Sequence, residues 1–135
     1  MGKVMVYKCV SEIAKHNVGK VIKLESGEKF GLFVGSWEES VPIKAHEHYK
    51  TTQVMYVLDG YGMLLTGECT VRNGCCEKTK NGAIILEKGM LVIIPPHTAH
   101  LIEVIGEKTA LEFLMFNVPS CGEGDFREIC KSCGG

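Results

Sequence analysis

The stretch IKAHEHYKTTQVMYVLDGYG, residues Ile43 to Gly62, decides how this sequence is interpreted. Apolar and polar residues alternate at both of its ends, which is typical of β-strands with one buried face. His46 and His48 interrupt that pattern. Because residues two apart on a strand share a face, both imidazoles are expected on one wall of the fold, where aliphatic side chains are usual.

Similar apolar runs recur along the chain, separated by Gly or Asn-Gly. This spacing predicts many antiparallel strands, few helices and an all-β sandwich or closed roll. Turns are expected at ESGEK, RNGCCEKTKNG, EKG, IGEK and GYG, and a helical turn at SEIAKHN, closed by Gly19. The predicted strands lie near Val4–Lys8, Lys20–Leu24, Lys29–Trp37, Ile43–His48, Gln53–Leu58, Gly62–Val71, Ala83–Leu86, Met90–Ile94, His100–Ile105 and Ala110–Val118.

Length and charge limit the organisation and the partners. The 135 residues suit one domain, which we expect to span residues 1–119, followed by a Cys- and Gly-containing tail over 120–135 that is loosely docked or flexible. With 15 Lys+Arg against 16 Asp+Glu and no clustered basic run, the sequence gives no indication of a nucleic acid or membrane partner. No apolar segment approaches the ~18 residues of a membrane span.

Seven cysteines are an odd number and show no even disulfide framework, so reduced thiols in a cytoplasmic protein are expected. Cys130 and Cys133 form a CKSC sequence near the end of the chain. A zinc site would need two more ligands, and a redox pair normally opens a helix. We therefore interpret both cysteines as tail thiols, with a metal or redox role as the alternative.

Two further side chains are expected near the histidine pair. The polar YKTT segment predicts a corner, after which Gln53 opens the next strand and turns inward. In GMLVIIPPHTAH, a strand ends at Pro95-Pro96 and His100 begins the following one. A neutral oxygen and a third imidazole are thus available from neighbouring elements.

These residues resemble the two motifs of a small single-domain cupin. The first motif, His-x-His followed by an acidic residue and a Gly, is matched by His46, His48, Gln53 and Gly60. The second, a Gly, a Pro and a His at fixed spacing, is matched by Gly89, Pro95 and His100. The matching strand pattern covers residues 20–118. The resemblance implies a double-stranded β-helix, or jelly-roll, barrel.

The resemblance also implies a divalent transition metal bound by His46, His48 and His100, with position 53 as a further ligand. Fe, Zn, Ni, Co, Cu and Mn all suit such a donor set. The sequence departs from the family at Gln53, where Glu is usual, and at His97, where Gly is usual. An amide oxygen cancels no charge, so the ion would keep +2 and favour an anionic, chelating ligand, or would bind more weakly. Gln53 is either a ligand or a hydrogen-bond partner that orients a histidine.

Several other side chains are candidates for a substrate pocket, although each is also compatible with plain core or, for the lysine, a solvated charge. They are Lys44, Met55, Tyr56, Met63, Phe113 and Met115. Glu103 and Glu112 are nominated as groups that could lie behind the histidines. His97 is expected to be an exposed turn residue, because its offset from His100 points it elsewhere.

We therefore expect a metal-dependent cupin enzyme that acts on a small oxygenated metabolite, by dioxygenase, isomerase or lyase chemistry. A non-catalytic cupin that binds or senses a small molecule is the alternative, and sugar-phosphate isomerisation is a third hypothesis that would want more basic residues than Lys44. The sequence assigns no catalytic residue, substrate or metal. The resemblance further implies a homodimer, and the apolar KVMVY near the start would suit strand exchange between its subunits.

Overall fold

The structure is a computed structural model that describes residues 4–27, 29–38, 46–48, 50–72, 75–104, 110–120 and 126–128. Within these ranges, the side chains of residues 46–48, 67–72, 75–81, 99 and 126–128 are not described. The elements are α1 (Val10–Lys15), β1 (Val21–Ser26), β2 (Gly31–Trp37), β3 (His46–His48), β4 (Thr52–Asp59), β5 (Tyr61–Arg72), β6 (Cys75–Glu87), β7 (Leu91–Ile94), β8 (Ala99–Val104), β9 (Leu111–Val118) and β10 (Phe126–Glu128).

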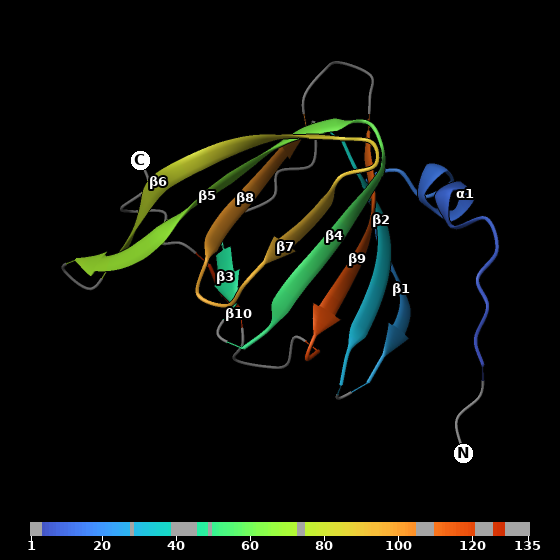
Figure 1. Cartoon of the computed structure of the whole chain (residues 1–135), viewed down its shortest axis with the longest axis horizontal. Helices are drawn as coiled ribbons and strands as arrows, with labels where there is room; N and C mark the ends of the chain where they lie inside the picture. Colours follow the sequence, from blue (N-terminus) through green and yellow to red (C-terminus); the bar gives the residue numbers. More distant parts are fainter. Residues whose placement is uncertain are drawn as a thin grey trace.

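The strands form two antiparallel sheets of five (Figure 1). The first sheet has the order β1-β2-β9-β4-β7, and the second has the order β10-β3-β8-β5-β6. Apart from the hairpins β1–β2 and β5–β6, neighbouring strands come from distant parts of the chain, as in a roll wound from a folded ribbon. The predicted all-β jelly-roll architecture is confirmed.

A single apolar core fills the space between the sheets. Both sheets contribute alternate residues of their strands, because successive side chains point to opposite faces. The fully buried members stabilise the fold by roughly 1.5–3 kcal/mol each. The buried cluster consists of Met55, Val57, Leu64, Leu86, Ile94, Ile102, Leu111 and Phe113.

Phe113 is the largest fully buried side chain of this core. Its ring lies 4.2 Å from that of Trp37, with the two planes at 48°. Gly35 lies directly opposite Phe113 in the register of β2 and β9. A Cβ at position 35 would come within 2.3 Å of the Phe113 ring, so only glycine leaves room for the ring there.

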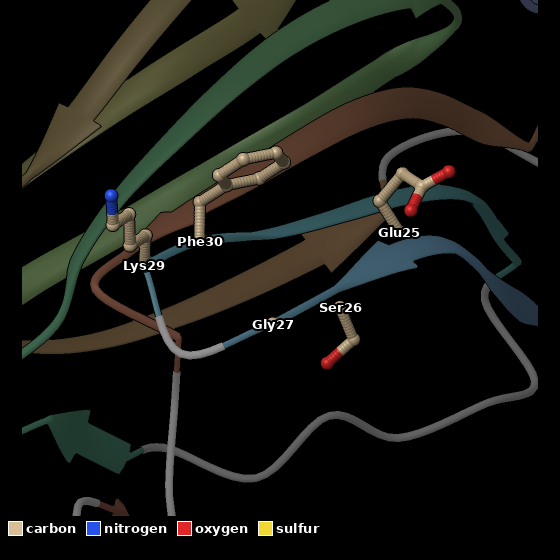
Figure 2. A pocket seen from close by; sticks show the side chains of 5 residues that line it. All are labelled: Glu25, Ser26, Gly27, Lys29 and Phe30. Carbon is tan, nitrogen blue, oxygen red and sulfur yellow. The ribbon is translucent and has the colours of Figure 1, made fainter. Parts of the chain in front are cut away.

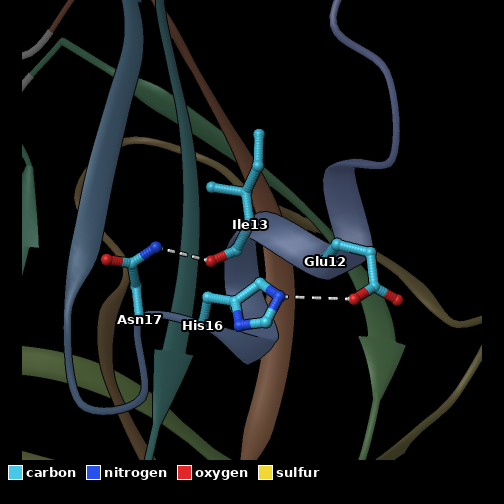
Figure 3. A network of polar contacts seen from close by, with 4 residues as sticks. All are labelled: Glu12, Ile13, His16 and Asn17. Atoms are coloured by element: carbon cyan, nitrogen blue, oxygen red, sulfur yellow. Dashed lines mark hydrogen bonds and ion pairs between the residues drawn. The ribbon is translucent and has the colours of Figure 1, made fainter.

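The helix α1 packs on the outer face of the first sheet, against β2 and β9 (Figure 1). Asn17 Nδ2 donates to the carbonyl of Ile13 at 2.8 Å, and His16 Nε2 lies 3.6 Å from a Glu12 carboxylate oxygen (Figure 3). Gly19 follows at φ 80°, a left-handed conformation that glycine adopts readily. The predicted helical turn closed by Gly19 is thus confirmed.

Two expectations about strands are wrong. Residues 4–9 form no strand, because the described part of the molecule pairs no strand with them, and Val4 and Val6 are 91% and 74% exposed. The turn expected at RNGCCEKTKNG is too long, because β5 and β6 pair through Arg72 and Cys75 and residues 75–82 are strand; residues 73–74 lie outside the described residues. Thr66 pairs with Gly82, but the next residue, Gly67, pairs with Lys80. The second Asn-Gly of this segment, at residues 81–82, therefore marks a β-bulge.

The structure also contains a strand that the sequence analysis does not predict. β10 pairs antiparallel with β3 and forms the edge of the second sheet. Its three residues lie inside the segment interpreted as a tail. A strand this short, in a polar and Gly-rich stretch, has no alternation long enough to be recognised.

Candidate metal centre

His100 is buried on the inner face of β8. Ile102, two residues further along the strand, belongs to the core, and His100 itself is 2% exposed. Its Nδ1 lies 2.9 Å from the carbonyl oxygen of Thr98. A carbonyl can only accept, so Nδ1 carries the proton and Nε2 carries the lone pair. In this tautomer Nε2 is the ring nitrogen that could bind a metal.

His46 stands directly opposite His100 in the register of β3 and β8. Opposed residues in antiparallel strands share a face and have Cα atoms about 4.5–5.5 Å apart. His46 is therefore placed on the inner face of the second sheet, in the same row as His100. His48, two residues along β3, falls on the same face by strand alternation.

Gln53 lies on the facing sheet, at the beginning of β4, and is 7% exposed. Its Nε2 donates to the sulfur of Met115 at 3.5 Å. Met115 lies opposite Met55 on the neighbouring strand β9, and both belong to or pack against the core. With the nitrogen engaged by Met115, the amide oxygen of Gln53 is the end that could meet a cation or an imidazole N–H.

Asn117 is a buried polar residue that its sequence context does not single out. It lies opposite Gln53 in the register of β4 and β9 and is 4% exposed. Its Oδ1 has no hydrogen-bond partner among the described residues. A buried acceptor without a partner costs roughly 1–3 kcal/mol, which makes Asn117 a candidate to bind a ligand at this wall. An Asn at an inward position of LEFLMFNV was the signal that could have found it.

The histidine strands and the two amides approach the same end of the barrel. Figure 1 shows that β3, the beginning of β4, the beginning of β8 and the end of β9 all lie toward one end. Imidazole nitrogens and neutral oxygens are donors that divalent transition metals accept. The residues present therefore fit the metal that the sequence resemblance implies.

Among the side chains that the structure describes, no group of three or more His, Cys, Asp or Glu could hold a metal ion. The side chains of His46 and His48 are not among them. The three-histidine site thus remains a prediction that the register supports.

A family model for cupins matches residues 33–124. The chain belongs to the cupin family. Among curated proteins, none matches this cupin significantly.

Solved structures with the same fold include proteins from three organisms. A conserved protein from Klebsiella pneumoniae with a double-stranded β-helix domain is 18% identical, has a TM-score of 0.69, and aligns over 96% of this chain and 100% of its own. A candidate sugar phosphate isomerase from Acidithiobacillus ferrooxidans is 23% identical, with a TM-score of 0.52, over 67% of this cupin and 50% of its own chain. A variant of Streptomyces PAC13 with uridine is 15% identical, with a TM-score of 0.60, over 78% and 72%.

The other predicted pocket residues of the cupin fall into two groups. Met55 and Phe113 are buried in the core, beside the half-buried Met115, so these three lie on the inner face. Tyr56 and Met63 do not. Tyr56 is 42% exposed and follows the core residue Met55 on β4, and Met63 precedes the core residue Leu64 on β5. Successive side chains of a strand point to opposite faces, so both lie on outer faces.

The two nominated glutamates are also on outer faces. Glu103 is exposed and follows the core residue Ile102 on β8. Glu112 is 8% exposed, but it lies between Leu111 and Phe113 on β9 and thus faces α1 rather than the core. Neither can lie behind the histidines. Lys44 lies outside the described residues, as do Cys130 and Cys133.

His97 agrees with its predicted role as an exposed turn residue. It has φ 62°, a left-handed conformation that explains why a glycine is usual at this position. Its exposed place in the turn between β7 and β8 separates it from the buried His100.

A surface pocket lies at a different place, on the hairpin between β1 and β2. It has a volume of about 270 Å³ and is lined by Glu25, Ser26, Gly27, Lys29 and Phe30 (Figure 2). The Phe30 ring stacks on Phe116, with centroids 5.1 Å apart. None of these residues belongs to the candidate metal centre, so the pocket is separate from it.

In the described part of the chain, no helix is long and apolar enough to cross a membrane.

Proposed function

We propose that this cupin is a metal-dependent enzyme that acts on a small oxygenated metabolite, with His46, His48 and His100 holding a divalent transition metal. The observation that supports this most directly is the register of His46 opposite His100. Two imidazoles on one face, with Cα atoms about 5 Å apart, can reach one ion. A bound metal would act as a Lewis acid toward substrate oxygens or, as iron, would allow oxygen chemistry.

The cupin's own residues would prepare the site. The Thr98 carbonyl fixes the His100 tautomer and keeps its ring in one orientation. Gln53 and Asn117 offer amide groups to a polar substrate at the opposite wall. Met55, Phe113 and Met115 form an apolar floor that excludes water and strengthens each polar contact above it.

The class of reaction stays open between dioxygenase, isomerase and lyase. The likeness to a candidate sugar phosphate isomerase keeps isomerisation among the hypotheses, and the PAC13 structure with uridine shows that a similar barrel accommodates an oxygen-rich small molecule. Oxygen uptake with Fe(II) and candidate diketones or thiols would separate oxygenase from non-redox chemistry. We also propose a cytoplasmic homodimer.

The test of the metal site is elemental analysis of the purified protein, alongside His46→Ala and His100→Ala. We expect close to one equivalent of metal in the wild type and a loss of most of it in both variants, because each removes one of three nitrogen donors. His16→Ala is the matched control, since that histidine lies on α1 with its side chain 78% exposed. It should retain the wild-type metal content.

If all four proteins are equally empty after reconstitution with Fe, Zn, Ni, Co, Cu and Mn, the metal-dependent proposal is wrong. The non-catalytic cupin that binds or senses a small molecule would then be the better account. Equal metal content in all four would mean that a metal binds elsewhere, and would also contradict the site.

A further inference from the structure

The cupin's candidate metal centre lacks the acidic residue that the family motif provides, because Gln53 stands in its place. Among the described side chains, the two glutamates nearest in sequence to the site elements, Glu103 and Glu112, lie on outer faces. Three neutral imidazoles and an amide leave the charge of a divalent ion uncompensated. A carboxylate from another part of the chain would remove this deficit.

The strand β10 brings such a residue to the row of the histidines. Glu128 stands directly opposite His46 in the register of β10 and β3. His46 in turn stands opposite His100, and His100 opposite Thr66 on β5. Glu128, His46, His100 and Thr66 therefore form one row across four strands of the second sheet.

This row lies on the inner face of the sheet. Directly opposed residues share a face, and His100 is buried on the same face as Ile102. Arg127, the other charged residue of β10, stands opposite Glu47 and falls on the outer face. Only Glu128 of this strand combines a negative charge with a place in the histidine row.

We propose that Glu128 supplies the carboxylate of the metal centre, in place of the Glu that the family motif has at position 53. This inference rests on the proposed function, because it needs the metal held by His46, His48 and His100. The carboxylate would come from the strand next to the histidine pair rather than from the facing sheet. It would cancel one unit of the ion's charge, as a motif Glu would.

The test is the affinity of the full chain for Co²⁺ and Zn²⁺, measured by competition with a chromophoric chelator. Glu128→Gln removes the charge and keeps the size, and we expect it to weaken binding tenfold or more. The Co²⁺ absorption spectrum should also change, because it depends on the ligand set. Glu47→Gln is the matched control: it removes a carboxylate next to both histidines, but on the other face, and should bind as the wild type does.

A second variant tests the charge itself. Adding Gln53→Glu to Glu128→Gln restores a carboxylate from the facing strand, and we expect it to recover most of the lost affinity. Circular dichroism with the wild-type β-sheet signal for all variants checks that they are folded.

The outcomes separate the two proposals. If the wild type binds Co²⁺ and His46→Ala does not, but Glu128→Gln binds as tightly as the wild type, the Glu128 proposal alone is wrong. Loss in Glu128→Gln that Gln53→Glu does not recover would also contradict it, because the residue would then act through the fold and not through its charge. If His46→Ala binds as the wild type does, the proposed function fails first.

Discussion

At two turns of this barrel the backbone has a positive φ, which favours glycine. Gly60 joins β4 to β5 at φ 86°, and its N–H donates to a carboxylate oxygen of Asp59 at 2.9 Å. A Cβ there would come within 2.0 Å of the carbonyl oxygen of Ala110. Gly89, in the turn before β7, has a similar φ of 90° but open space around it. Substituting each of these glycines would therefore distinguish the cost of backbone strain from the cost of a steric clash.

We predict that Gly60→Ala lowers the free energy of unfolding by about 3 kcal/mol, and Gly89→Ala by about 1 kcal/mol. Both substitutions force alanine into a left-handed conformation, but only the first also meets a backbone oxygen. Urea denaturation of the two variants and of the wild type measures the difference. Equal losses at both positions would show that the clash at Gly60 relaxes without cost.

The residues of the candidate site differ in how well the sequence predicts them. His46, His48 and His100 stand out because imidazoles interrupt an apolar pattern at a characteristic spacing. Asn117 does not stand out, because only the structure shows that its side chain is buried and that its Oδ1 has no hydrogen-bond partner among the described residues. Glu128 cannot be recognised without the register that brings it beside His46.

Among the elements, α1 is held against the first sheet over a buried carboxyl group. Glu112 on β9 lies under α1, opposite Ser36 on β2 and Asp59 on β4. Burial raises the pKa of Glu112, and the carboxylates of Asp59 and Glu12 raise it further, while Lys15 lowers it. The Oε2 atom of Glu112 has no hydrogen-bond partner in the described part of the chain. The ionised form is therefore disfavoured in the folded state.

We predict that Glu112→Gln increases the free energy of unfolding at pH 7 and that this gain shrinks as the pH falls. A raised pKa means that the folded state binds more protons than the unfolded state between the two pKa values, so stability falls as pH rises through that window. Below the ordinary carboxyl range both states are protonated, and the variant gains nothing. Thermal unfolding from pH 4 to pH 8 measures the gain.

Asp59→Asn serves as the control for the electrostatic part of this effect. It removes a charge that raises the Glu112 pKa, so it should also stabilise the protein at pH 7, but less than Glu112→Gln, because burial is the larger cause. A Glu112→Gln gain that is the same at pH 4 and pH 7 would contradict the account.

Most of the strands can be predicted from the sequence. Those that cannot are strands whose pairing partners, and not their own sequence pattern, determine their structure. β4, with one buried face, alternates clearly, and the largely apolar run of β9, which α1 covers on its outer face, is also predicted within a few residues. The outer half of the β5–β6 hairpin is polar on successive residues, so its sequence shows turn chemistry and no alternation. β10 is defined only by its partner β3. Elements fixed by distant pairing leave little trace in local sequence.

At the scale of the whole molecule, the N-terminal segment exposes apolar side chains that contacts within a single chain do not cover. Val4, Met5 and Val6 are 91%, 58% and 74% exposed. Tyr7 ties the segment to β1, because its hydroxyl lies 2.8 Å from the carbonyl of Leu24 and 2.6 Å from a carboxylate oxygen of Glu25. The apolar residues before this tether face solvent, and the strand to which Tyr7 is tied, β1, is an edge strand of the first sheet.

We predict that deleting residues 1–8 weakens the proposed homodimer, because it removes the exposed apolar segment that would pair with a second copy. Light scattering over a range of concentrations measures the mass. Tyr7→Phe, which keeps the segment but loses both hydrogen bonds of the hydroxyl, should associate nearly as the wild type does. An unchanged mass after the deletion would count against this interface.

The place of β3 in the second sheet has a consequence for biosynthesis. Its two neighbours, β8 and β10, lie far downstream in the chain. While a ribosome is still producing the middle of the protein, His46 and His48 have already emerged, yet neither flanking strand exists. The row that holds His46 is complete only after residues 126–128 have been made, so β3 takes its place between two strands that are both synthesised later.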